Sequence, residues 1–164
     1  MSTAIRAAVI TVSDACAGGH REDTSGQTLY DLLTEIGAEI VERKILADDL
    51  DPLTHTLRVL CERADINLIM TTGGTGLGPR DNTPEATLKV IEREAPGIAE
   101  AIRAESLKVT PMAMISRGVC GVCSGTLIVN LPGSPKAVRE SFAVVKPVLQ
   151  HSIDLLSGKT EHRA

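Results

Sequence analysis

Apolar positions follow two alternating periods along the first half of the chain. Short β-branched runs, typical of buried strands, are separated by stretches in which apolar residues recur every three to four positions, as on one face of a helix. In residues 26–36, for example, Leu29, Leu32 and Leu33 share such a face. This alternation predicts an α/β fold with a mainly parallel sheet covered by helices on both faces. We expect strands at 6–13, 39–46 and 66–71, and helices at 26–36 and 51–64.

The second half continues with helices and two adjacent strands. No internal repeat, linker or low-complexity segment interrupts the 164 residues, which we therefore expect to form one domain. Residues 157–164 are polar and are expected to form a loose tail. We expect helices at 83–94, 96–107, 136–145 and 148–156, the last two separated by Pro147, and strands at 115–122 and 126–130, joined by a tight turn at Ser124-Gly125.

The overall composition excludes several classes of protein. Lys and Arg number 17 against 21 Asp and Glu, for a net charge of −4, and no basic patch points to nucleic acid. The aromatic residues are Tyr30 and Phe142 alone, so stacking on aromatic platforms is not expected. Apolar runs are too short to span a membrane, and the first residues carry no signal pattern. The sequence therefore predicts a soluble, cytoplasmic protein.

Cysteine and histidine patterns give little sign of metal or nucleophilic chemistry. Cys120 and Cys123 have the spacing of a redox motif or a zinc half-site, but no second ligand pair accompanies them. We interpret them as small residues flanking a turn. None of the four histidines stands beside a serine or cysteine in a way that suggests a catalytic triad. They are His20, His55, His151 and His162.

A glycine-rich loop follows the third expected strand. Glycines at 73, 74, 76 and 78 let the backbone approach a ligand closely or take a positive φ, and Thr71, Thr72 and Thr75 add hydroxyl groups. The loop lacks the ending of a P-loop, and Pro79 stands where a dinucleotide fingerprint has its third glycine. The pattern favours a binding loop of another kind, with a plain turn as the alternative.

Three helices are expected to begin at a polar residue followed by proline, a pattern that predicts N-terminal capping. Two of these starts, Thr83-Pro84 and Ser134-Pro135, follow glycine-containing loops, where free N–H groups favour an anion such as phosphate. The third, Asp51-Pro52, needs no role beyond capping. Lys136 lies in a first helical turn, where it opposes the helix dipole and where a bound phosphate would explain it. The pattern predicts a ligand that carries phosphate.

Acidic residues follow the second and third expected strands. Asp48 and Asp49 end the second strand, and Asp81 ends the glycine-rich loop. Because neighbouring parallel strands bring such residues to one edge of the sheet, we expect Asp48 and Asp81 to lie close together. Carboxylates beside phosphate repel it unless a cation intervenes, and Mg²⁺ binds carboxylates together with substrate phosphates. The sequence therefore predicts an Mg²⁺ site that would neutralise charge during transfer at phosphorus.

These loops resemble the molybdopterin-binding domain shared by the Mog/MoaB proteins, the G domain of gephyrin and its plant counterpart. The matching motifs run in the same order from residue 13 to residue 136. They are Ser13-Asp14, Asp23-x-Ser25-Gly26, Thr71-Thr72-Gly73-Gly74-Thr75-Gly76, Pro79-Arg80-Asp81-x-Thr83-Pro84-Glu85-Ala86, Met114-Ile115-Ser116-Arg117 and Asn130-Leu131-Pro132-Gly133-Ser134-Pro135-Lys136.

The resemblance implies a three-layer α/β/α domain that assembles as a homotrimer or hexamer and acts in molybdenum cofactor biosynthesis. Adenylyltransferase members join the terminal phosphate of molybdopterin to the AMP part of ATP with Mg²⁺ and release pyrophosphate. The family's two functional aspartates fall on Asp48 and Asp81, as catalytic residues and metal ligands. Gly73 to Gly76 would supply backbone donors, and Ser134 and Lys136 would hold the pterin phosphate or ATP. The other binding positions implied are Ser13, Asp14, Thr72, Thr75, Ser116, Asn130, Pro132 and Gly133.

Two departures leave alternatives open. The family often has proline before the first aspartate, where this chain has Ala47, so Asp49 is the alternative to Asp48 in that register. Some MoaB-type members keep the fold without adenylyl transfer, so the second hypothesis is a non-catalytic pterin-binding or scaffold oligomer that hands substrate to another protein. A molybdenum-insertion protein is the partner that the resemblance implies. A nucleotide-phosphate hydrolase is a more remote third. The two acids favour the enzyme, because a pure binder gains nothing from carboxylates beside a phosphate.

Overall fold

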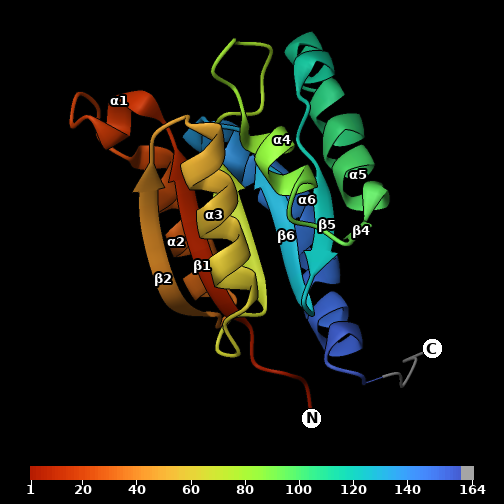
Figure 1. The fold of residues 1–164 in the computed structure, drawn as a ribbon. Helices are drawn as coiled ribbons and strands as arrows, with labels where there is room; N and C mark the ends of the chain where they lie inside the picture. Colours follow the sequence, from red (N-terminus) through yellow and green to blue (C-terminus); the bar gives the residue numbers. More distant parts are fainter. Residues whose placement is uncertain (160–164) are drawn as a thin grey trace.

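The computed structural model describes residues 1–159, so His162 and most of the expected tail lie outside the described residues. In the described part, the strands form one six-stranded sheet in the order β2-β1-β3-β6-β5-β4 (Figure 1). β2, β1, β3 and β6 run parallel, whereas β5 and β4 form an antiparallel edge. The strands are β1 (Arg6–Val12), β2 (Glu39–Leu46), β3 (Leu68–Thr72), β4 (Arg93–Glu94), β5 (Cys120–Cys123) and β6 (Thr126–Leu131).

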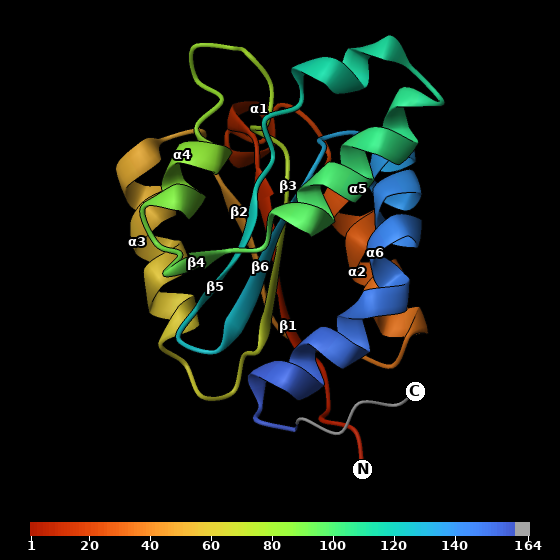
Figure 2. The ribbon, with the colours of Figure 1, turned by 90° about the vertical axis from the view of Figure 1, so that its right-hand side faces the viewer.

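Helices cover both faces of the sheet, which confirms the expected three layers (Figure 2). One face carries α2 (Thr24–Glu35), α5 (Pro96–Leu107) and α6 (Pro135–Leu156), and the other carries α3 (Leu50–Cys61) and α4 (Thr83–Leu88). Alternate residues of β1 serve the two cores, since Val9 packs with Leu29 of α2 and Ile10 packs with Leu57 of α3. Two short elements complete the fold: α1 (Asp14–Ala17) and the 3₁₀ helix η1 (Pro111–Ile115).

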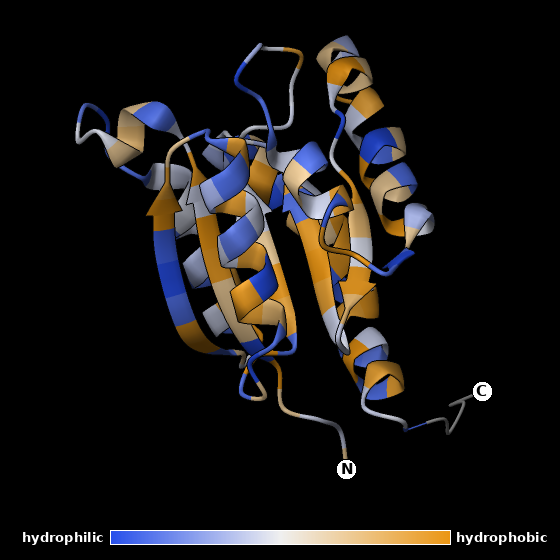
Figure 3. Ribbon diagram, viewed as in Figure 1, coloured by the Kyte–Doolittle hydropathy of each residue, from blue (hydrophilic) through white to orange (hydrophobic). Residues whose placement is uncertain are grey.

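Hydropathy along the strands follows this layering (Figure 3). The central strands are apolar because both of their faces are covered, and every residue of β3 and β6 is buried. The edge strand β2 is only partly buried and carries the charged run Glu42-Arg43-Lys44. Charged side chains on an edge strand discourage pairing with a strand of another molecule.

The expected strand at 115–122 is wrong over most of its length. Residues 111–115 form η1, and the strand begins only at Cys120. Pro111 favours the first turn of a helix, and the Thr110 hydroxyl accepts a hydrogen bond from the Met112 N–H at 3.3 Å. Met112, Met114 and Ile115 are exposed, so this apolar run does not belong to the core. Cys120 and Cys123 lie on β5 itself and are buried, rather than flanking a turn.

Three of the expected helices also have different bounds. α4 ends at Leu88 instead of residue 94, because Arg93-Glu94 pairs with β5 as strand β4. The pair of helices expected around Pro147 is one continuous helix, α6. Its buried positions, such as Phe142, Val145 and Leu149, keep a spacing of three or four residues across the proline. Packing of that face maintains the helix although proline donates no hydrogen bond there.

The order of the strands places a crevice between β1 and β3. The chain leaves β1 through α2 to reach β2 on one side, and then returns through α3 to β3 on the other side. Ligands of open α/β sheets bind at such a reversal, outside the carboxyl ends of the strands. Asp48 and Asp81 follow β2 and β3, which are both neighbours of β1 and not of each other. Among the described helices, none is long and apolar enough to cross a membrane.

Candidate functional site

A polar cavity of about 190 Å³ lies at the carboxyl edge of the sheet, at the reversal between β1 and β3; we call it the first cavity. The segments after β1, β2, β3 and β6 all contribute to its wall, as the topology predicts. The lining residues are Thr11, Val12, Ser13, Arg21, Ser25, Asp48, Thr72, Gly73, Gly74, Asp81 and Gly133.

The glycine-rich loop can pass close to the end of β1 because two of its residues, both glycines, carry no side chain. Gly73 and Gly74 have φ values of +97° and +66°. A Cβ on Gly73 would lie 2.3 Å from the carbonyl oxygen of Val12, so the loop could not pass the end of β1 so closely. The Thr83 hydroxyl, at the start of α4, donates to the Gly73 carbonyl at 2.9 Å and fixes the loop.

Asp48 lines the first cavity and has one buried carboxylate oxygen without a partner. Its Oδ2 accepts a hydrogen bond from the Asp14 N–H at 2.9 Å, whereas its buried Oδ1 has no partner among residues 1–159. Asn82 donates from Nδ2 to the Asp48 carbonyl at 3.0 Å and holds the backbone. Burial raises the pKa of Asp48, and the nearby charges of Asp14 and Asp81 act in the same direction, whereas the Asp14 N–H opposes the shift. A cation would satisfy Oδ1.

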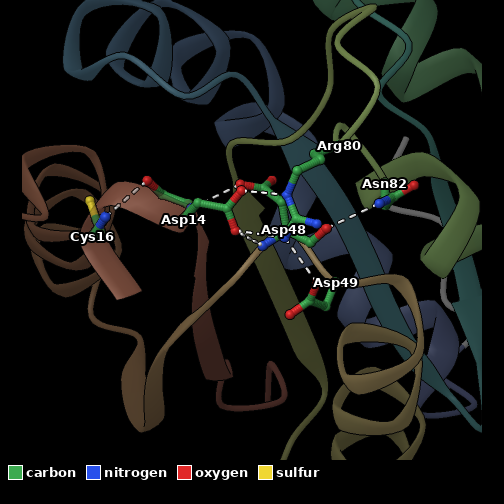
Figure 4. Close-up of polar contacts among 7 residues, drawn as sticks. Asp14, Cys16, Asp48, Asp49, Arg80 and Asn82 are labelled. Atoms are coloured by element: carbon green, nitrogen blue, oxygen red, sulfur yellow. Dashed lines mark hydrogen bonds and ion pairs between the residues drawn. The ribbon is translucent and has the colours of Figure 1, made fainter. Parts of the chain in front are cut away.

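Asp14 and Arg80 lie next to Asp48 (Figure 4). Arg80 donates from Nε and a terminal nitrogen to both Asp14 oxygens at 2.7 and 2.9 Å, and from the same terminal nitrogen to Asp49 at 2.9 Å. The Arg80 guanidinium and the Asp48 N–H lower the pKa of Asp14 to about 2. Asp14 is therefore a carboxylate with its charge already balanced by an arginine.

Asp81 lies at the end of a loop that Arg117 closes. The Arg117 side chain donates to the carbonyls of Gly76 and Asp81, at 2.7 and 2.8 Å, and pairs with Glu85 of α4. The Asp81 Oδ2 accepts from the Gly78 N–H at 2.8 Å. Arg117 thus holds both ends of the segment 76–81 and keeps Asp81 at the first cavity.

The donor set suits a magnesium ion that is shared with a ligand. Within residues 1–159, no three His, Cys, Asp or Glu side chains are grouped so that they could enclose a metal on their own. Mg²⁺ does not need such an enclosure, because it binds through one or two carboxylates together with phosphate oxygens and water. The unpartnered Oδ1 of Asp48 and the carboxylate of Asp81 fit that mode of binding.

A second cavity, of about 260 Å³, lies across the Pro132–Ser134 turn from the first. Gly133 lines the first cavity, whereas Pro132 and Ser134 line the second, so the turn forms a wall between them. The remaining lining residues come from α5, η1, α6 and their connections: Ile102, Arg103, Ser106, Thr110, Met112, Ala113, Ser116, Ala137 and Glu140.

Most of the residues expected at the site come together here. Ser13, Thr72, Gly73, Gly74 and Gly133 line the first cavity with Asp48 and Asp81, and Ser116, Pro132 and Ser134 line the second. Asp14 lies beside Asp48, whereas Asp49 pairs with Arg80 and is not among the lining residues.

Four other expected residues line neither cavity. The Asn130 side chain is 3% exposed, and its Nδ2 donates to the hydroxyls of Thr71 and Thr87, so it connects β6, β3 and α4. Lys136 is exposed and lies 3.7 Å from a Glu140 oxygen. Thr75 and Gly76 accept hydrogen bonds from Arg117 through their carbonyls.

The capping predictions are correct only at Ser134. Its hydroxyl accepts a hydrogen bond from the Ala137 N–H at 3.2 Å. Asp51 and Thr83 lie inside their helices, which begin after Asp49 and Asn82. α4 has only six residues, so its N-terminus offers a small dipole.

Sequence reasoning missed several residues that the structure places at the site, four of which line or hold the parts of the first cavity. Arg21 and Ser25 line the first cavity, and Arg80 and Arg117 hold the loops around it. Arg80 and Arg117 stood inside motifs already noted, but nothing in the sequence indicates their partners. Arg80 reaches Asp14 across 66 positions, a pairing that only the fold makes visible.

Residues 8–151 match the model of a family described as a probable molybdopterin binding domain. The chain is 39% identical over 156 residues to the molybdopterin adenylyltransferase of Helicobacter pylori, covering 94% of this chain and 89% of that protein. It is 44% identical over 149 residues to the molybdenum cofactor synthesis protein cinnamon of Drosophila melanogaster. That match covers 90% of this chain but only 25% of the longer protein. Among solved structures, the molybdopterin biosynthesis enzyme MoaB from Thermus thermophilus has a TM-score of 0.88 at 45% identity, with 94% of this chain and 98% of that chain covered.

Proposed function

Because this chain belongs to the family of molybdopterin-binding domains, we propose that it acts as a single such domain and is a molybdopterin adenylyltransferase of molybdenum cofactor biosynthesis. In the proposed reaction, an oxygen of the terminal phosphate of molybdopterin attacks the α-phosphorus of ATP. The bond between the α-phosphorus and the bridging oxygen breaks, and pyrophosphate leaves. The products are molybdopterin-AMP and pyrophosphate.

One observation carries this proposal beyond ligand binding. The Asp48 Oδ1 is buried without a hydrogen-bond partner in the described chain, and Asp48 lines a cavity that Asp81 also lines. A carboxylate that faced only a phosphate would repel it, whereas a carboxylate that faces a phosphate-bound cation attracts it. Two acids beside glycine-loop N–H groups therefore suit the transfer of a phosphoryl-type group.

Each part of the first cavity has a distinct proposed role. Asp48 and Asp81 would hold Mg²⁺, which would supply positive charge against the negative charge that develops on the phosphate oxygens. The backbone of Gly73 and Gly74 allows phosphate to approach the loop without meeting a side chain. Arg21 and Ser25, which also line the cavity, supply additional donors for phosphate oxygens. Alignment of the two phosphates across this cavity is the main contribution of the chain.

The second cavity is the proposed place for the pterin. It shares the Pro132–Ser134 turn with the first cavity, and therefore a pterin bound there could extend its phosphate past Ser134 toward the glycine loop. Ser116 and Ser134 supply polar contacts among mostly apolar neighbours, as small-molecule sites commonly do. Lys136, exposed at the start of α6, remains a proposed phosphate contact.

The proposed reaction is tested by mixing the protein with molybdopterin and Mg-ATP and following both pyrophosphate release and the mass of the pterin product. We expect molybdopterin-AMP to form with one pyrophosphate per turnover. Asp48→Asn and Asp81→Asn should each abolish transfer while leaving molybdopterin binding within a few-fold of the parent protein. Asp51→Asn, which changes an exposed acid on α3 away from both cavities, is the matched control and should retain activity.

Other outcomes distinguish the remaining hypotheses. Tight pterin binding without AMP transfer would indicate a non-catalytic binding protein. Release of free nucleotide without pterin would indicate a hydrolase. Unchanged turnover in Asp81→Asn would contradict the role given to the two acids.

We also propose that the chain works as a homotrimer or hexamer and passes its product to a molybdenum-inserting partner. Support comes from five large apolar side chains that are exposed within residues 107–115, from the end of α5 through η1. Exposed apolar side chains gathered in one region are typical of protein contact sites. Sedimentation equilibrium at several protein concentrations tests the oligomeric state. The five exposed apolar side chains are those of Leu107, Val109, Met112, Met114 and Ile115.

A further inference from the structure

Asp14 and Asp48 are held together by two reciprocal hydrogen bonds. The Asp14 N–H donates to Asp48 Oδ2 at 2.9 Å, and the Asp48 N–H donates to Asp14 Oδ1 at 3.0 Å. The first bond fixes the rotation of the Asp48 carboxylate, so its other oxygen faces the glycine loop. A Cβ on Gly74 would lie only 3.0 Å from that oxygen.

Arg80 holds this pair from a third loop (Figure 4). Its guanidinium contacts both oxygens of Asp14, at 2.7 and 2.9 Å, and it also reaches Asp49 at 2.9 Å. The contacts connect the segments that follow β1, β2 and β3, the three strands around the reversal. Arg80 therefore helps to fix the side chain of Asp14, the residue whose own N–H orients Asp48.

These ion pairs contribute little to folding. The side chains of Arg80 and Asp14 are 55% and 45% exposed, and ion pairs between such solvated groups stabilise a protein by about 0–1 kcal/mol. The bidentate geometry is nonetheless specific, because the planar fork of arginine matches a carboxylate and the ammonium of lysine does not. An exposed but well-formed ion pair of this kind is suited to holding neighbouring side chains in position.

We propose that Arg80 and Asp14 are positioning residues, the Arg80–Asp14 latch, which keep the Asp48 carboxylate turned so that Oδ1 faces the cation of the reaction. The proposal rests on the function proposed above for Asp48. Neither residue of the latch contacts the reacting atoms; Arg80 acts through Asp14, and Asp14 acts through its N–H on Asp48. Outer partners of metal ligands typically change metal affinity or activity by about 10- to 100-fold when they are removed.

The test uses Arg80→Gln, Arg80→Lys and Asp14→Asn in the full chain, with Mn²⁺ alone as the metal probe. Mn²⁺ affinity is measured by electron paramagnetic resonance, with Asp48→Asn as the reference for loss of the site. AMP transfer is measured separately as a function of Mg²⁺ concentration. Arg63→Gln is the matched control, because Arg63 also binds an aspartate through two nitrogens and contacts a second acid. Arg63 lines neither cavity.

The latch predicts that Arg80→Gln weakens Mn²⁺ binding and lowers kcat by about tenfold or more, with the KM for molybdopterin unchanged. Arg80→Lys should recover only a small part of the loss, and Arg63→Gln should match the parent protein. In the double variant Asp14→Asn with Arg80→Gln, the loss should be no larger than in either single variant, because both residues act through one contact. Thermal unfolding of each variant should stay close to that of the parent protein.

The sign of the change in Mn²⁺ affinity decides between geometry and net charge. Removal of Arg80 leaves the site more negative, so charge alone would tighten Mn²⁺ binding, whereas the latch predicts weaker binding. Tighter or unchanged binding in Arg80→Gln, or a parent protein whose Mn²⁺ binding does not depend on Asp48, overturns the latch. A parent protein that binds Mn²⁺ through Asp48, with the expected loss in Arg80→Gln, but transfers no AMP, would contradict only the proposed function.

Discussion

Gly74 lies at the point where the backbone of the glycine loop approaches the Asp48 carboxylate. A Cβ at this position would lie 2.3 Å from the Thr83 hydroxyl oxygen and 3.0 Å from Asp48 Oδ1. The Thr83 hydroxyl cannot move without losing its bond to the Gly73 carbonyl. Gly74 also has a φ of +66°, a conformation that is strained for any residue with a Cβ.

We therefore expect Gly74→Ala to lower AMP transfer by at least tenfold and to destabilise the fold by about 2–3 kcal/mol, the sum of backbone strain and crowding. Urea unfolding and the pyrophosphate assay measure the two effects. Gly125→Ala is the control: Gly125 has a φ of +78°, but a Cβ there would meet nothing within 4 Å. It should lose only about 1 kcal/mol and keep full activity. Equal behaviour of the two variants would contradict the crowding argument.

Single residues also mark where sequence reasoning reached its limit. The sequence predicted that Asp48 and Asp81 meet, because both follow parallel strands, and both do line the first cavity. It left Asp48 and Asp49 as alternatives. Their side chains point in different directions, and the backbone conformation of the segment after β2 decides which of them faces the cavity. The partners of Arg80 and Arg117 were not predictable, because they depend on how three separate loops pack.

At the scale of elements, Pro147 interrupts the backbone hydrogen bonds of α6 without ending the helix. The residue is exposed, so no core packing depends on its ring. Alanine would restore a backbone donor and is favoured over proline in a helix interior by about 3 kcal/mol. We expect Pro147→Ala to stabilise the protein by about 1–3 kcal/mol in urea unfolding, with Lys146→Ala within about 0.5 kcal/mol of the parent. A destabilised Pro147→Ala would show that the proline has a positive structural role.

The ion pair between Glu85 and Arg117 connects α4 to the end of the glycine loop. Hydrogen bonding from Arg117 lowers the pKa of Glu85 below its ordinary value of 4.5. Because the pKa in the folded state lies below that of the unfolded state, the pair stabilises the fold fully above pH 4.5. The contribution is lost as the pH falls through the lower, folded-state value.

We therefore expect Glu85→Gln to have a lower Tm than the parent protein near neutral pH, and the difference to vanish in acid. Differential scanning fluorimetry between about pH 3 and pH 7 measures both curves. Glu105→Gln breaks an exposed ion pair with Lys108 and should change Tm little at any pH. A difference that persisted unchanged at the lowest pH would mean that the charge of Glu85 is not responsible.

Helices and strands were predictable where the apolar residues follow a clear period and the sheet is covered by helices. They were not predictable where a strand forms only through pairing at the edge of the sheet. Strands β1 and β3 follow their apolar runs, since both faces of these central strands are covered. The antiparallel hairpin of β5 and β6 was expected from the Ser124-Gly125 turn. Strand β4 was missed because it has two residues and exists only through its pairing with β5. The apolar residues of η1 resembled a strand, although they lie on the surface.

At the scale of the whole molecule, the site follows from the path of the chain. The reversal between β1 and β3 opens the sheet at its carboxyl edge, and the loops there contain the glycines, the two acids and the Pro132–Ser134 turn. The opposite edge contains the turn at 62–67 and the Ser124-Gly125 turn, which connect elements without lining either cavity. One end of the molecule should therefore respond to ligand while the other does not.

Hydrogen exchange with and without Mg-ATP tests this division of the molecule. We expect slower exchange in residues 12–25, 47–50, 72–83 and 131–134, because a ligand bound across the first cavity restrains the loops that line it or hold its lining residues. Residues 36–38, 62–67 and 124–125 should exchange at the same rate in both conditions. The Asp48→Asn variant should lose the protection, since a phosphate-bound cation would have one carboxylate fewer. Protection that appeared first at 62–67 would place the nucleotide on the opposite edge and contradict the assignment of the first cavity.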